Sequence, residues 1–149
     1  MAAATVEVKG VRPTVVALKK WEPEARRELR RALRAAGMEV VSEARARVAP
    51  FSRKTPPTIR TGTRIRSFEV EVAVRAGRPG VEIATLLEKG NKGGKSEEFF
   101  KHPVWGHRDR PWAKQAMHPY LGPAFRAKQA TFLQRIVEAL DAATVKLDL

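Results

Sequence analysis

The sequence predicts an α+β domain in which a long N-terminal helix and a C-terminal helix pack on a small antiparallel sheet containing a central β-hairpin. Three patterns in the 149 residues lead to this prediction. Residues 23–48 and 122–145 carry apolar side chains at helical spacing, and residues 68–85 alternate between apolar and polar side chains around a turn. A chain of this length fits one domain, 1–149, with residues 1–12 as an N-terminal arm.

The first predicted helix covers residues 23–48, PEARRELRRALRAAGMEVVSEARARV. Pro23 suits the first turn of a helix, and Pro50 ends it. The apolar stripe is spaced three and four residues apart and consists of Leu29, Leu33, Ala36, Val40 and Ala44. The opposite face is rich in arginine, which is more typical of a solvated surface than of a nucleic-acid contact.

A basic loop is predicted over residues 51–66, because FSRKTPPTIRTGTRIR contains Pro-Pro and Thr-Gly pairs and no carboxylate. Its cations are Arg53, Lys54, Arg60, Arg64 and Arg66. A hairpin is predicted next, with one strand over 68–74, a turn at AGRPG (76–80) and a return strand over 81–85.

The predicted organisation ends with a long loop insert, residues 89–118, and a helix. The insert begins with a Gly- and Lys-rich stretch and continues into the aromatic segment HPVWGHRDRPWAKQAMHPY, residues 102–120. Gly122-Pro123 opens the last helix, which runs to about Val145. Its predicted buried stripe is Phe125, Phe132, Leu133, Ile136, Val137, Leu140 and Ala143.

No motif of the sequence predicts catalysis, a metal or a cofactor. The stretch GNKGGKS, residues 90–96, has three residues between its first glycine and the final Gly-Lys, whereas a P-loop needs four to wrap its amides round the phosphates. The three histidines lack the spacing that sets two imidazoles on one helical face, and Arg108 and Arg110 flank the nearby Asp109. A metal-dependent nuclease using the histidines is therefore the weakest functional hypothesis. The absence of cysteine excludes disulfides and a thiol nucleophile.

The net charge of +13 and the pI near 10.9 point to an anionic partner. Nucleic acid is one candidate, since Lys and Arg release counterions when they neutralise phosphates. Acidic protein surfaces inside an assembly are the equally favoured alternative. No leader-like segment and no bilayer-spanning apolar run is evident, so we expect a soluble protein without a membrane partner.

Four short motifs, in order, resemble those of a family of tailed-phage proteins. They are Ala49-Pro50 after the long helix, TGTRIRS (61–67) before the hairpin, LEKG (87–90), and PYLGPA (119–124) before the last helix. Their order is similar to that in the tail-completion, or head–tail joining, proteins of long-tailed phages, related to the minor tail protein Z group. Two departures are Ala84-Thr85-Leu86, where the family commonly has Tyr-Ala before the acidic residue, and a longer insert over 92–114.

The resemblance implies a structural virion protein without enzymatic activity that completes the top of the tail and joins it to the head. It implies a homo-oligomeric ring, expected to be a hexamer, around the DNA channel, with tail-terminator or tail-tube proteins and head-completion neck proteins as neighbours. The expected location is the virion neck, after assembly in the host cytoplasm. A free basic DNA-binding, nucleoid-associated protein is the main alternative.

Two sets of residues are expected to serve this role. Non-specific contact with the passing double-stranded DNA is assigned to the cations of the basic loop, Arg53, Lys54, Arg60, Arg64 and Arg66. Packing or subunit contacts are assigned to residues of the matched motifs and to the aromatic anchors between them, which are Glu88, Gly90, Trp105, Trp112, Pro119, Tyr120, Leu121 and Pro123.

Overall fold

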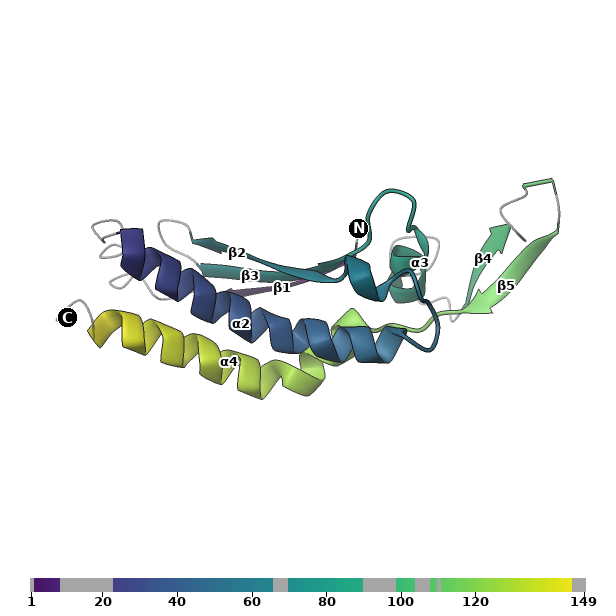
Figure 1. The fold of residues 1–149 in the computed structure, drawn as a ribbon. Helices are drawn as coiled ribbons and strands as arrows, with labels where there is room; N and C mark the ends of the chain where they lie inside the picture. The colour runs from purple at the N-terminus through teal and green to yellow at the C-terminus, as the bar shows by residue number, and fades with distance from the viewer. Residues whose placement is uncertain are drawn as a thin grey trace.

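Two long helices lie side by side under one face of a small sheet (Figure 1). The computed structural model describes residues 2–8, 23–65, 70–89, 99–103, 108–109 and 111–145. Helix α2 covers Pro23–Val48, and helix α4 covers Leu121–Val145. The main sheet has the order β1-β3-β2, formed by Ala2–Val8, Val70–Ala76 and Arg60–Ile65, and β3 is antiparallel to both neighbours. The α+β prediction is confirmed.

Helix α2 has the predicted bounds, and its five predicted stripe residues are all buried. In α4 the residues Phe132, Ile136, Leu140 and Ala143 are buried against the core. Leu133 and Val137 are exposed, so their predicted burial is wrong. They lie on the outward side of the helix because α4 meets chiefly α2 and the sheet, and that contact uses a narrower stripe than the sequence pattern offers.

The inward face of the sheet comes from every second residue of β3, Val70, Val72, Val74 and Ala76, all of which are buried. Strand β2 crosses α2 closely at Gly37. A β-carbon added there would overlap Thr61 Oγ1 and lie 3.2 Å from Val72 Cγ1. A glycine is therefore required inside α2 by packing, although glycine lowers helix propensity.

The hairpin prediction is wrong in its partner strand. Strand β3 is correct, but it pairs with the preceding strand β2, and the predicted return strand over 81–85 is replaced by helix α3, Ile83–Lys89. The turn before it contains Gly77 and Gly80 at φ values of 99° and 81°. Val81, Ala84 and Leu87 are buried at a spacing of three residues, so this short apolar run fits a helical turn as well as a strand.

Three predicted irregular segments contain regular structure. The N-terminal arm, 1–12, includes strand β1, which pairs with β3 from Ala2↔Ala76 to Val8↔Val70. The basic loop, 51–66, includes a 3-10 turn η1, Pro56–Thr58, and strand β2. The loop insert, 89–118, includes strands β4, Phe99–Pro103, and β5, Trp112–Ala116, which form a hairpin that projects from the body (Figure 1). Strands at the edge of a sheet tolerate charged residues and glycine, and these residues are the reason why the sequence predicts loops here.

Candidate functional site

The carboxylate of Glu88 is the centre of a cluster that joins α3 to the start of α4. Its Oε2 accepts hydrogen bonds from the backbone N–H groups of Tyr120 (2.6 Å) and Leu121 (2.9 Å), and its Oε1 accepts one from Gly122 (3.0 Å). The first amides of a helix have no partner within the helix, and the positive end of its dipole favours a carboxylate. Glu88 therefore caps α4 from a distant part of the chain.

The next backbone positions of α4 leave no further N–H group without an acceptor up to Ala124. Pro123 has no N–H group, and the Ala124 N–H donates to the Tyr120 carbonyl at 3.1 Å, which is the first bond of the helix. One residue before the PYLGPA motif, the His118 N–H donates to the Leu87 carbonyl at 3.1 Å. The PYLGPA and LEKG motifs are thus fitted to each other through backbone and carboxylate bonds.

Tyr120 fixes this junction from inside the core. Its side chain is fully buried, and its hydroxyl donates to the Ala84 carbonyl at 2.8 Å. Burial, and secondarily the negative charge of Glu88, raise the pKa of Tyr120 above its ordinary value. The phenol therefore stays neutral and serves as a hydrogen-bond donor.

The predicted packing residues divide into buried and exposed groups. Tyr120 and Leu121 are buried, and Glu88 and Pro123 are half-buried in the junction. Trp112 on β5 is 51% exposed, so it is not an anchor of the core of one chain. Pro119 is exposed beside the junction, and Gly90 and Trp105 lie outside the described residues.

The basic loop is held to the end of α2 by Arg45, a residue outside the predicted basic set. Its guanidinium donates to the carbonyls of Pro56 (3.1 Å) and Ile59 (2.9 Å). Within the loop, the Thr58 hydroxyl donates to the Thr55 carbonyl and accepts from the Gly77 N–H. These bonds order the backbone, while Arg53 and Lys54 remain exposed.

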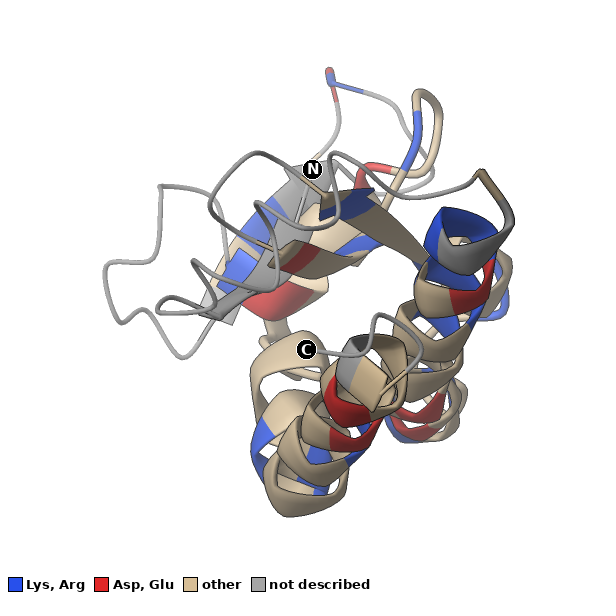
Figure 2. Cartoon of the chain, turned by 90° about the vertical axis from the view of Figure 1, so that its left-hand side faces the viewer, with Lys and Arg blue, Asp and Glu red and all other residues tan. Residues whose placement is uncertain are grey.

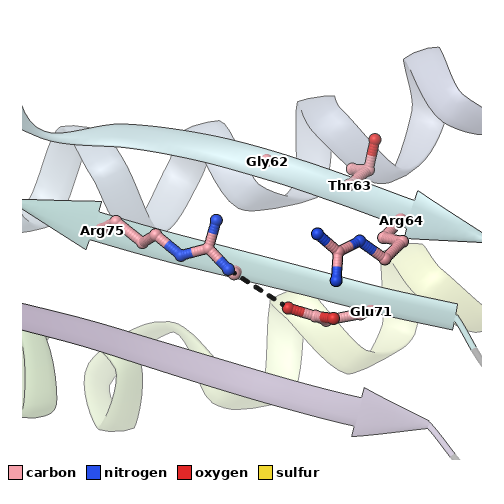
Figure 3. A pocket seen from close by; sticks show the side chains of 6 residues that line it. Gly62, Thr63, Arg64, Glu71 and Arg75 are labelled. Atoms are coloured by element: carbon pink, nitrogen blue, oxygen red, sulfur yellow. Dashed lines mark hydrogen bonds and ion pairs between the residues drawn. The ribbon is translucent and has the colours of Figure 1, made fainter.

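Arg60 and Arg64 lie on the outward face of the main sheet and not in a loop. Their register partners on β3 are Arg75 and Glu71, and Gly62 opposite Ala73 leaves a shallow hollow between them. Figure 3 shows Arg64 and Arg75 extending toward Glu71 from opposite sides, and Arg75 pairs with Glu71 at 3.4 Å. Arg75 was not predicted as part of the basic set, because its position opposite Arg60 depends on the strand pairing.

Positive charge is distributed over several surfaces. A second hollow beside the basic loop is lined by Lys54 and Arg78 together with Pro57, Pro79, Gly80 and Val81. The N-terminal half of α2 adds the exposed arginines Arg27, Arg30, Arg31 and Arg34. Basic residues accordingly occur on both the helices and the strands (Figure 2). Arg66 lies outside the described residues, so the structure gives the positions of four of the five predicted cations.

Among the described residues, no group of three or more His, Asp or Glu side chains is arranged to hold a metal ion. His118 stacks on Phe51, with ring centroids 3.6 Å apart and an interplanar angle of 8°. His107 and the side chain of His102 lie outside the described part of the chain. None of the helices in that described part is long and apolar enough to cross a membrane.

Comparisons of the chain with protein-family models, curated proteins and solved structures found no match.

Proposed function

We propose that the chain is a structural subunit that completes the top of a phage tail and joins it to the head, as a ring around the DNA channel. The observation that carries the proposal is the direct contact between two matched motifs. Glu88 of LEKG caps the helix that PYLGPA opens, and Tyr120 of PYLGPA donates to Ala84 one turn before Glu88. If the similarity of these short motifs were due to chance, there would be no reason for two of them to contact each other in the folded chain.

In this role, the DNA contact falls to Arg60 and Arg64 on the outward sheet face and to Arg53 and Lys54 on the loop. These residues are exposed, and one carboxylate, Glu71, lies in the hollow that Arg64 lines. Phosphates are the expected ligands, because nothing in this arrangement discriminates between bases. Binding by each copy should be weak, with strength from repetition around the ring, so that DNA can move through it.

The second candidate function, a free DNA-binding protein, is favoured by the same outward arginines. Coexpression with phage neck and tail-tube proteins separates the two. A joining protein should copurify with those partners after nuclease treatment, whereas a nucleoid-associated protein should retain DNA and none of them. Recovery of DNA alone would reject the proposal.

The DNA-binding role has its own test in the salt dependence of binding. Replacing Arg53, Lys54, Arg60 and Arg64 by glutamine should flatten the slope of log affinity against log salt by about 0.9 for each phosphate that is no longer neutralised. The matched control replaces four exposed arginines of α2, Arg27, Arg30, Arg31 and Arg34, and should change the slope less. An unchanged slope in the first variant, combined with failure to enter particles, would assign these cations to a protein neighbour.

A further inference from the structure

The outward face of the main sheet carries two guanidinium groups that converge on one carboxylate. Arg64 of β2 is the register partner of Glu71 on β3, and the side chain of Arg75 extends along β3 toward the same carboxylate (Figure 3). Gly62 and Ala73 face each other between them, and the lack of a long side chain at this pair leaves the hollow that both arginines line. The described residues of the hollow thus bring two positive charges to one negative charge.

The contact between Arg75 and Glu71 leaves this arginine able to bind a ligand. Its Nη2 lies 3.4 Å from Glu71 Oε1, which is longer than the spacing of about 2.7–2.9 Å in a strong charge-assisted hydrogen bond. The side chain of Arg75 is 41% exposed, whereas that of Glu71 is 15% exposed. An anion from solvent can therefore reach the guanidinium group, while the carboxylate is largely covered.

The charges around the hollow favour an anion that approaches from the β2 side. Arg60 is the register partner of Arg75, although like charges directly opposite each other destabilise an antiparallel pair. Among the described residues, neither Arg60 nor Arg64 has an ion-pair partner. On the other side of β3, the register places Glu7 of β1 beside Glu71. The cations without a partner therefore belong to β2.

We propose that one DNA phosphate binds between Arg64 and Arg75, and that Glu71 competes with this phosphate for Arg75. Without DNA, the carboxylate accepts the hydrogen bond from Arg75 and partly neutralises the hollow. When a phosphate binds, Arg75 exchanges one anionic partner for another, and Glu71 is left close to a second negative charge. The carboxylate thereby lowers the affinity of each copy for DNA.

The inference deepens the proposed function and rests on its DNA contact. It adds Arg75 to the residues that bind phosphate, and it names the group that keeps the binding of one copy weak. A weak contact that is repeated around a ring holds DNA through many copies, yet each contact can be exchanged as the duplex moves. Glu71 thus matters for the passage of DNA and not for the choice of its sequence.

The direct test compares Glu71→Gln with Glu43→Gln in the binding of purified protein to a short DNA duplex of mixed sequence. Glu43 is the matched control, because it also pairs with an arginine four positions away, Arg47 at 2.8 Å, but lies on α2. Both variants raise the net charge by the same amount. Glu71→Gln should bind DNA roughly two- to fivefold more tightly than the control at low salt, on the scale of one surface ion pair. Equal affinities of the two variants would overturn the proposal.

A double-mutant cycle tests whether Glu71 acts through Arg75. Arg75→Gln should weaken binding and flatten the slope of log affinity against log salt by about 0.9, the value for one phosphate. In the Arg75→Gln background, Glu71→Gln should tighten binding less than it does in the wild-type protein, because the arginine for which it competes is absent. The same gain in both backgrounds would assign the effect to net charge alone and overturn the competition. Loss of folding cannot imitate the expected result, because the Glu71 variant gains affinity.

Three outcomes separate this inference from the tail-joining function. Tighter binding of Glu71→Gln to poly-glutamate, a probe for acidic protein surfaces, without tighter binding to DNA would overturn the phosphate assignment. A wild-type protein without salt-dependent affinity for DNA would also overturn the inference, whereas tail joining is judged separately by particle assembly. Conversely, coupled tightening through Arg75 together with normal particles from a deletion would support the competition and reject the function.

Discussion

Replacing Glu88 by glutamine should destabilise the junction between α3 and α4 by about 2–3 kcal/mol. The carboxylate accepts three backbone N–H groups, at 2.6, 2.9 and 3.0 Å. Each hydrogen bond to a charged group contributes about 1.5–3 kcal/mol, but the site is only partly buried and water replaces some of the broken bonds. Glutamine keeps the shape, loses the charge that favours the helix terminus, and turns one acceptor into a donor that faces other donors.

The expected change is a fall in melting temperature of roughly 5–10 °C for a domain of this size, together with faster hydrogen exchange at the amides of residues 120–122. Glu82→Gln is the matched control, because Glu82 is an exposed carboxylate that accepts a single backbone bond, from Gly80 at 3.1 Å. It should change stability by less than about 0.5 kcal/mol. Equal effects of the two substitutions would refute the capping role of Glu88.

Three further perturbations test the packing. The raised pKa of Tyr120 means that the fold favours the neutral phenol, so the stabilisation from the buried phenol is complete below pH 10 and is lost as the pH rises above it. The chain has one tyrosine, so the absorbance of its phenolate should appear in the same transition as unfolding, and two separate transitions would contradict burial. Gly37→Ala should lower the free energy of unfolding by about 2 kcal/mol, because the added methyl group overlaps with Thr61. In a Thr61→Ala background the same substitution should lower it by less than about 1 kcal/mol, and a double-mutant cycle of denaturation measurements would test the difference. Arg45→Met should increase proteolysis between residues 53 and 60 without unfolding α2, and an unchanged cleavage pattern would argue against the anchoring bonds.

The long helices were predictable because their signals are local and repeated. Leu29, Leu33 and Val40 recur over several turns of α2, and prolines mark its boundaries, so neighbouring residues determine the element. Short elements lack this redundancy. The run from Val81 to Leu87 fits an alternating strand and a helical turn equally well. Its packing beside Tyr120, which is far away in the sequence, favours the helix.

The sequence indicates which residues belong to the candidate site but not which of them contact one another. The motifs containing Glu88 and Tyr120 were identified from the sequence, yet the capping bonds join residues more than thirty positions apart, and no local pattern specifies such a pairing. The sequence pattern predicts a loop for Arg60 and Arg64, whereas the strand register places them on a sheet face with Arg75. The exposure of Leu133 and Val137 could not be predicted either, because helical spacing does not give the width of the buried face of a helix.

The central claim is that this chain joins heads to tails, and electron microscopy of particles made with and without its gene tests it most directly. We expect that the deletion leaves DNA-filled heads and complete-looking tails that do not join stably, and that the gene supplied in trans restores whole particles. Normal infectious particles from the deletion would contradict the claim, as would a defect confined to head filling or to tail length.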